Sequence, residues 1–159
     1  MKIIFTYTAY LIIAIILFAC STQTDPLPQE FYGLKIAKKL IGKDTKDYVD
    51  RLHFNEVAPD ENEIGFYSGD LGTAVIYITY YNNSESALRE YLKMTKNISP
   101  NNSPFVRSEF IILNNNRVYR TYGMGQVHFV FVKADMLIWL SEDPAIGSKF
   151  VEEYLKYLK

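Results

Sequence analysis

Hydrophobic and polar positions alternate in several stretches of the chain after residue 60, which is typical of half-buried strands. The clearest alternation runs from residue 73 to 81. Both of its alternating sets are rather apolar, so it predicts a central strand covered on both sides. Turns rich in Gly, Asn and Asp join the predicted strands in pairs. The other strands are expected at residues 63–67, 109–113, 117–122, 127–133 and 136–141.

Apolar residues at helical spacing predict three helices. Asp44 is the expected N-cap of the first, and the stretch from Asn82 to Glu85 holds the cap of the second. Asp143 is the expected cap of the last helix, with Pro144 at its first position. Residues 31–41 fit a strand and a helix equally, and both remain open. The predicted fold class is α+β, a mostly antiparallel sheet with about three helices packed on it.

The N-terminal residues differ from the rest of the chain. Residues 3–19 are nearly all apolar and follow the positive Lys2, which is the form of a secretory signal peptide. The end of this run, Leu17-Phe18-Ala19-Cys20, resembles a bacterial lipobox. The resemblance implies cleavage before Cys20 and a diacylglyceryl group on its thiol. The alternative is an uncut membrane anchor, because the run reaches the lower limit of about 17 residues for a span.

These features divide the chain into a signal peptide (1–19), a lipidated tether (20–30) and a single α+β domain (31–159). The tether is polar and contains Pro26 and Pro28. Cys20 is the only cysteine, so the domain is expected to fold without a disulfide. The expected location is the exported face of a membrane. By analogy with Gram-negative sorting, Ser21 rather than Asp after the cysteine favours an outer membrane, where the cell has one.

Charge and composition limit the partners. The chain of 159 residues carries 17 basic and 18 acidic side chains, so it lacks the basic field of a nucleic-acid-binding protein. Aromatic residues are abundant, with 13 Tyr and 10 Phe. An exposed aromatic sheet face would suit a glycan or a protein partner, and the alternative is a face covered by the helices. The residues considered for it are Tyr77, Tyr81, Tyr119, Tyr122 and Phe129.

Catalytic and metal-binding patterns are scarce. His53 and His128 are the only histidines, so no pair stands at i and i+4, and lipidation of Cys20 would leave no thiolate for a zinc site of the ordinary type. The stretch from Asp60 to Leu71 fails the calcium-loop pattern at two ligand positions. We therefore expect no metal, no cofactor and no enzymatic activity.

The best candidate for a binding site is the segment of residues 122–128. Two glycines flank Met124, and glycine tolerates backbone geometries that other residues resist. Tyr122, Gln126 and His128 add a ring and hydrogen-bonding groups that would converge if the chain bends here. The alternative is that both glycines serve only a tight turn or a bulge between two strands.

The segment of residues 117–158, which includes VYRTYGMGQVHFVFVKADMLIWLSEDP, resembles the C-terminal half of domains in uncharacterised bacterial envelope lipoproteins. That resemblance implies no activity. The expected function is a lipid-anchored envelope lipoprotein with a non-enzymatic binding or structural domain, whose partner is an envelope protein or a glycan. One alternative is a carrier of haem or lipid, with His128 or Met124 as axial ligand. The other is an envelope hydrolase with two carboxylates in a cleft.

Overall fold

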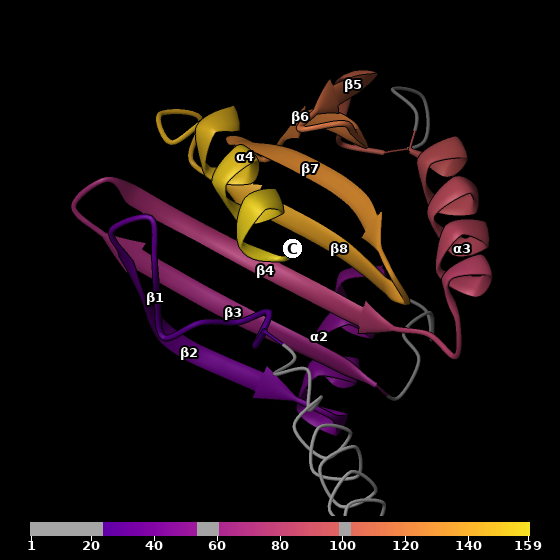
Figure 1. The fold of residues 1–159 in the computed structure, drawn as a ribbon, viewed down its shortest axis with the longest axis horizontal. Coiled ribbons are helices and arrows are strands. Elements are labelled where there is room, and N and C mark those ends of the chain that lie inside the picture. Colours follow the sequence, from indigo (N-terminus) through magenta and orange to yellow (C-terminus); the bar gives the residue numbers. More distant parts are fainter. Residues whose placement is uncertain (1–23, 54–60, 99–102) are drawn as a thin grey trace, which may run out of the picture.

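The computed structural model describes residues 24–53, 61–98 and 103–159 of the chain. These residues form three helices and one antiparallel sheet of eight strands in the order β1-β2-β3-β4-β8-β7-β6-β5 (Figure 1). The α+β class with an antiparallel sheet is therefore confirmed.

The elements have the following bounds. The strands are β1 (Glu30–Phe31), β2 (Leu34–Ile41), β3 (Asn62–Gly69), β4 (Gly72–Tyr80), β5 (Val106–Leu113), β6 (Asn116–Gly123), β7 (Gln126–Lys133) and β8 (Met136–Glu142). The helices are α2 (Lys43–His53), α3 (Ser84–Asn97) and α4 (Ser148–Tyr157). Every predicted strand overlaps one of these strands. The segment left open between strand and helix is strand β2, which pairs with β3.

Strand β4 lies in the middle of the sheet, as its pattern predicts. It pairs with β3 on one side and with β8 on the other. After β4 the chain passes through α3 to the far edge at β5, and three hairpins then return it to β8. The alternating apolar residues of β4 are buried on one face and half-buried on the other, so both faces are covered.

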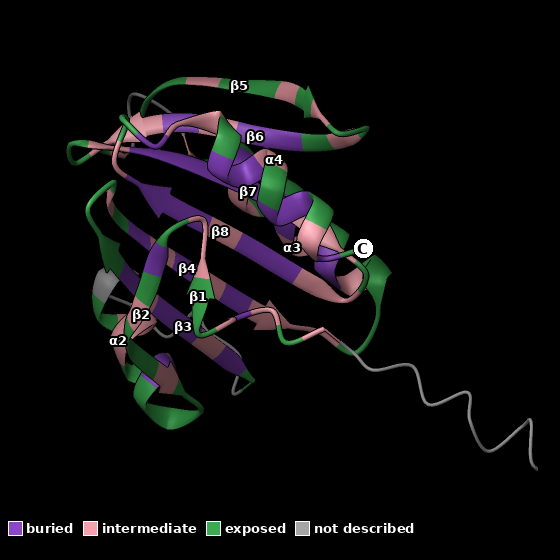
Figure 2. Cartoon of the chain, turned by 60° about the vertical axis from the view of Figure 1, so that its left-hand side comes forward, coloured by how far each residue is buried: buried purple, intermediate pink, exposed green. Residues whose placement is uncertain are grey.

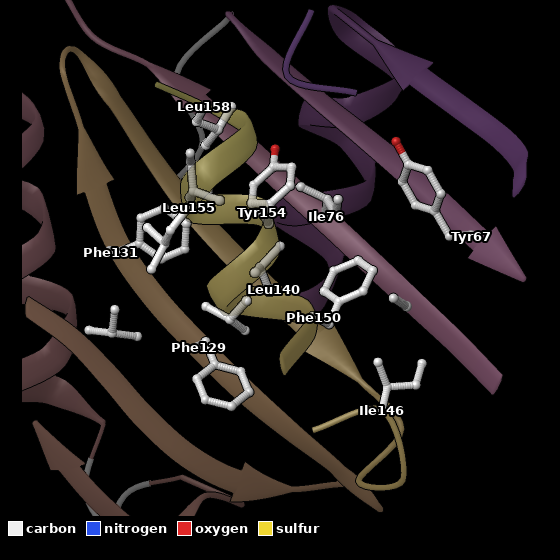
Figure 3. Packing of buried hydrophobic residues seen from close by; sticks show 14 of the residues in the cluster. Tyr67, Ile76, Phe129, Phe131, Leu140, Ile146, Phe150, Tyr154, Leu155 and Leu158 are labelled. Atoms are coloured by element: carbon white, nitrogen blue, oxygen red, sulfur yellow. The ribbon is translucent and has the colours of Figure 1, made fainter. Parts of the chain in front are cut away.

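Helix α4 covers one face of the sheet, which we call the α4 face. Phe150, Tyr154 and Leu155 of the helix belong to the main hydrophobic core (Figure 3). They pack against inward-facing side chains of β4, β7 and β8, among them Ile76 and Phe129. Burial of this apolar surface is the main source of stability for a domain of this size.

Helices α2 and α3 cover the opposite face. Tyr48 of α2 packs edge-on against Phe66 of β3, while α3 lies over β7 and β8. Tyr91 of α3 forms a smaller hydrophobic cluster with Tyr119 and Val130 of the sheet. Figure 2 shows that buried residues concentrate on the central strands, whereas β5 and α2 carry many exposed residues.

The domain begins by residue 25, ahead of the boundary predicted at residue 31. Leu27 is fully buried in the main core. Residues 24–30 have the polar, proline-containing composition of a tether, but the side chain of Leu27 packs into the main core. Residues 1–23, which include the predicted signal peptide and the first part of the tether, lie outside the described residues. Among the residues described, no helix is long and apolar enough to cross a bilayer.

Three tyrosine hydroxyls clamp this N-terminal segment on the α4 face. Each donates a hydrogen bond to a backbone carbonyl of the segment. The pairs are Tyr157 with Asp25 at 2.8 Å, Tyr154 with Pro26, and Tyr67 with Pro28 at 2.9 Å. Because these tyrosines come from β3 and α4, the segment is fixed to both halves of the domain.

The start of the last helix differs from the prediction. Helix α4 begins at Ser148, after turns over residues 144–147, and Gly147 precedes it with a positive φ of 63°. The Asp143 carboxylate does not cap the helix. It accepts hydrogen bonds from the backbone N–H of Thr73 at 2.7 Å and from its hydroxyl at 3.1 Å, at the start of β4.

The other two helix starts lie within a residue or two of the prediction. The N-cap of α3 is Asn83, within the predicted stretch from Asn82 to Glu85, and its side chain accepts from the Ser86 N–H at 2.9 Å. Asp44 lies in the first turn of α2, where an acidic side chain is favourable, and does not precede the helix.

Candidate functional site

The predicted segment of residues 122–128 is the β6–β7 hairpin. Gly123 pairs with Gln126, and the two residues between them, Met124 and Gly125, have φ of 51° and 79°. This is the geometry of a type I′ turn. A Cβ atom at Gly123 would lie 2.6 Å from the ring of Phe105. Both glycines therefore have a structural role, one in the turn and one in the close approach of Phe105.

The structure does not bring the four predicted site residues together. Tyr122 is opposite Val127 and lies on the α4 face, whereas His128 is opposite Thr121 and lies on the other face. Met124 is exposed at the tip of the turn. Gln126 is half-buried and has the same strand parity as His128. The prediction that these side chains converge is therefore wrong. Opposite residues of a hairpin share a face and successive residues alternate, so Tyr122 and His128 point to opposite faces.

His128 instead belongs to a buried hydrogen-bond network that joins β7 to β8. Its Nε2 atom lies 3.0 Å from the carbonyl oxygen of Gly123. A carbonyl can only accept, so we assign the ring proton to Nε2. The unprotonated Nδ1 then accepts from the Ser141 hydroxyl at 2.8 Å, and the Trp139 Nε1–H donates to Ser141 Oγ at 2.9 Å. Burial lowers the pKa of His128, opposed in part by the Gly123 hydrogen bond, so the imidazole is neutral at neutral pH.

A serine hydroxyl on a histidine nitrogen is the pairing found in nucleophilic hydrolases. Here Ser141 and His128 are both buried, and the Phe105 ring lies edge-on over the imidazole at a centroid distance of 4.9 Å. The same ring contacts Trp139 at 5.4 Å. An axial haem ligand needs a free ring nitrogen, and both nitrogens of His128 are within hydrogen-bonding distance of protein atoms. The network therefore links β7 to β8 and leaves neither ring nitrogen of His128 open to a ligand.

The aromatic residues do not share one sheet face. Tyr77, Tyr81 and Tyr119 lie on the face covered by α2 and α3, and Tyr119 is buried. Tyr122 and Phe129 lie on the α4 face, where Phe129 is part of the main core. The helices therefore cover most of these rings, as in the alternative considered for the aromatic surplus.

Glu142 is a buried carboxyl group that is not among the residues predicted from the sequence. It ends β8 on the α4 face, between Ala74 and Val127, and it is fully buried. Neither carboxyl oxygen has a hydrogen-bond partner among the described residues. Burial raises the pKa of Glu142 to about 8, so the group is protonated at neutral pH. The sequence contained one sign of this burial. Glu142 follows Ile138 and Leu140 at every second position of the strand, so its side chain points to the same face as theirs.

The outer edge strand β5 exposes apolar side chains on the face opposite α4. Phe110 is 44% exposed and Ile112 is 69% exposed. The guanidinium of Arg117 lies 3.9 Å from the centroid of the Phe110 ring, and the Tyr91 ring of α3 packs against the same ring at 6.4 Å. We call Phe110, Ile112, Tyr91 and Arg117 the β5 surface.

The backbone of β5 also presents open hydrogen-bonding groups. Asn114 and Asn115, with φ of 47° and 61°, form a two-residue turn to β6. In such a turn the flanking residues, here Leu113 and Asn116, form a hydrogen-bonded pair. The alternation along the strand then points the N–H and C=O of Phe110 and Ile112 away from β6, toward the free edge.

The other edge of the sheet is protected. Strand β1 is only two residues long. Strand β2 next to it carries Lys35, Lys38 and Lys39, and Lys39 forms an ion pair with Glu63 of β3 at 2.8 Å. Short edge strands and lysines are the usual means of preventing edge-to-edge association. Among the described residues, the sheet therefore has one protected edge, at β1 and β2, and one open edge, at β5.

A hollow of about 330 Å³ lies where β2 ends and β3 begins. It is lined by Ile41, Gly42, Glu61, Asn62, Glu63 and Tyr80. Within the described part of the chain, no group of three or more His, Cys, Asp or Glu side chains is placed to hold a metal ion.

The β5 surface is the strongest candidate for a functional site, since it combines exposed apolar side chains with open backbone groups. The sequence did not predict this surface, and the glycine-containing turn of residues 122–128 was the predicted site. None of the protein-family models, curated proteins or solved structures compared with the chain matches it.

Proposed function

We propose that the chain is a lipid-anchored protein of a bacterial cell envelope and that its domain is a non-enzymatic binding module. The observation that carries this proposal is the β5 surface. Exposed apolar residues beside an unpaired sheet edge are characteristic of protein interaction sites. A protein partner fits this surface better than a glycan, because an open strand edge is complementary to another strand.

The lipid anchor is proposed from the lipobox-like residues before Cys20. The tyrosine clamp begins at Asp25, five residues after the cysteine. Five residues span at most about 18 Å when fully extended. A lipid on Cys20 would therefore hold the domain close to the bilayer, and the clamped segment on the α4 face would limit its orientation.

The anchor is tested by metabolic labelling with a fatty-acid probe, followed by membrane fractionation. The wild-type chain should be labelled and should sediment with membranes, whereas Cys20→Ala should lose both properties. Equal labelling of the two chains would contradict lipidation at Cys20.

The binding role is tested with a photo-crosslinking amino acid at Ile112. Leu71, on the β3–β4 turn, is the matched control because it is also an exposed aliphatic residue, at 55% against 69%. A discrete adduct in membranes that forms from position 112 and not from position 71 is the expected result. Equal adducts from both positions, or none from position 112, would contradict a binding role for the β5 surface.

A further inference from the structure

We infer that the partner of the β5 surface is a second copy of this chain, joined edge to edge through β5. The inference deepens the proposed function, on which it rests for the role of this surface. It depends on three features of β5, which are the pattern of its open backbone groups, the order of its side chains, and the side of the sheet on which the N-terminal segment lies.

The open backbone groups define which pairings are allowed. The edge-facing N–H and C=O groups belong to Phe110 and Ile112. An antiparallel partner strand must oppose them with residues whose groups also face outward. Between two copies of β5, Phe110 of one chain can therefore stand opposite the partner's Ile112, and Ile112 opposite the partner's Phe110.

This register is centred on the regular part of the strand. A bulge interrupts β5 between Val106 and Glu109, with Arg107 at φ of 54°, and the turn begins after Leu113. The regular segment is thus residues 109–113, and its middle residue is Ile111. A two-fold axis at Ile111 pairs all five residues of one copy with the five of the other.

Side-chain chemistry favours the same register. It places the exposed side chains of Phe110 and Ile112 from both copies side by side on one face, and aromatic with β-branched pairs stabilise sheets. Glu109 is then opposite the partner's Leu113. A register shifted so that Glu109 opposes itself would bring two carboxylates together, which is unfavourable.

The position of the N-terminal segment is compatible with one shared membrane. A two-fold axis through a continuous sheet is perpendicular to it, so the α4 faces of both copies are on the same side. The clamped segment from Asp25 to Pro28 lies on that face in each copy. Both anchors would therefore reach the same bilayer, and confinement to one membrane raises the effective concentration of each copy for the other.

Cysteine crosslinking in membranes tests the register. In the proposed pair, Ile111 opposes the partner's Ile111 as a non-hydrogen-bonded pair with Cα atoms about 4.5 Å apart, within disulfide range. Leu113 is the matched control, because it is on the same face and packs on the same core. It lies about 14 Å from the partner's Leu113, which is too far for a disulfide.

The full chain carrying Ile111→Cys should form a disulfide-linked dimer under mild oxidation at least tenfold faster than Leu113→Cys. Adding Ile112→Lys to Ile111→Cys should reduce crosslinking to the control level, since it places charge in the apolar contact. Sedimentation in detergent should give two copies for the wild type and one copy for Ile112→Lys, which should still unfold cooperatively because Ile112 is exposed. Equal crosslinking of both cysteine variants, or a monomeric wild type, would overturn the inference.

The wild-type chain separates this inference from the proposed anchor. A lipidated Cys20 has no free thiol, so the wild type should give no disulfide. If it does crosslink, the anchor is contradicted, and Ile111→Cys is compared with Leu113→Cys in a Cys20→Ser background, where the same tenfold difference is expected.

Discussion

The hydroxyl of Tyr154, near the end of the chain, donates a hydrogen bond to the backbone carbonyl of Pro26, 128 residues earlier. This contact joins the first described segment to the last helix. It also explains why Leu27 between two prolines is buried in the core and does not belong to a flexible tether.

Tyr154→Phe should lower the free energy of unfolding by about 1 kcal/mol, because it removes one hydrogen bond and leaves the Pro26 carbonyl without this partner. Hydrogen exchange at the Leu27 amide, which donates to Asp25 Oδ1 at 2.9 Å, should become faster as the segment loosens. Tyr32→Phe is the control, since the Tyr32 ring packs on Phe150. Faster Leu27 exchange in both variants would contradict the clamp.

Glu142→Gln should remove a pH dependence of stability. The pKa of Glu142 is about 8 in the folded chain against an ordinary value of 4.5, so the unfolded chain loses this proton first as pH rises. The stability contributed by the protonated carboxyl is complete below pH 4.5 and is lost as pH rises to about 8. The loss amounts to about 3–5 kcal/mol.

Urea unfolding of wild type and Glu142→Gln across this pH range measures the difference. Glu152→Gln, at a half-exposed carboxyl on α4, is the control and should follow the wild type. If Glu142→Gln also follows the wild type, the carboxyl of Glu142 is not held in its protonated form.

His128→Phe should destabilise the domain by about 2–4 kcal/mol, because the Ser141 hydroxyl and the Gly123 carbonyl each lose a buried partner. The lowered pKa of His128 gives a pH effect of opposite sign to that of Glu142. Its contribution is complete above the ordinary value of 6.5 and is lost as pH falls through the lower folded value.

Nitrogen NMR of the histidine ring tests this assignment directly. It should show a neutral His128 with the proton on Nε2 at pH 6.5. A ring that is half-protonated at that pH would mean that the network is open to solvent.

Gly72→Ala should destabilise the domain by about 1–3 kcal/mol. Gly72 has φ of 129°, a conformation that other residues rarely adopt, and a Cβ atom there would lie 2.6 Å from Asp143 Oδ2. Gly42→Ala is the matched control, because its φ is also positive, at 55°, but among the described residues no atom beyond its chain neighbours lies within 4 Å of the added Cβ. Thermal unfolding should show the larger loss at Gly72, and equal losses would mean that the Asp143 contact adds nothing.

Local patterns predicted the sheet well because hairpins are local structures. The alternation around Ile76 and Ile78 and the turns at Asn114-Asn115 and Ala134-Asp135 involve residues close in sequence. These signals identified every strand from β3 to β8. They also predicted the turn at Met124-Gly125, although not its effect on neighbouring side chains.

Two of the errors share one physical origin, which is contact between residues far apart in the chain. Asp143 has the local features of a helix cap, but Thr73, 70 residues away, binds its carboxylate. The burial of Leu27 likewise depends on β3 and α4. Composition near residue 27 contains no information on those elements.

The candidate site shows a different limit. Tyr122 and His128 have the same parity within one strand, but a two-residue turn lies between them, and Tyr122 is opposite Val127. His128 is therefore on the other face. The β5 surface was not predictable either, because strand order, and hence which strand is at the edge, depends on how the two halves of the sheet pair at β4 and β8.

The two-residue length of β1 has a consequence for stoichiometry. A sheet with two adhesive edges can add copies at both ends and grow into a filament. Here the short strand β1 and the lysines of β2 prevent pairing at one edge. Self-association through β5 therefore pairs the one adhesive edge of each copy with that of the other, and growth stops at a closed pair.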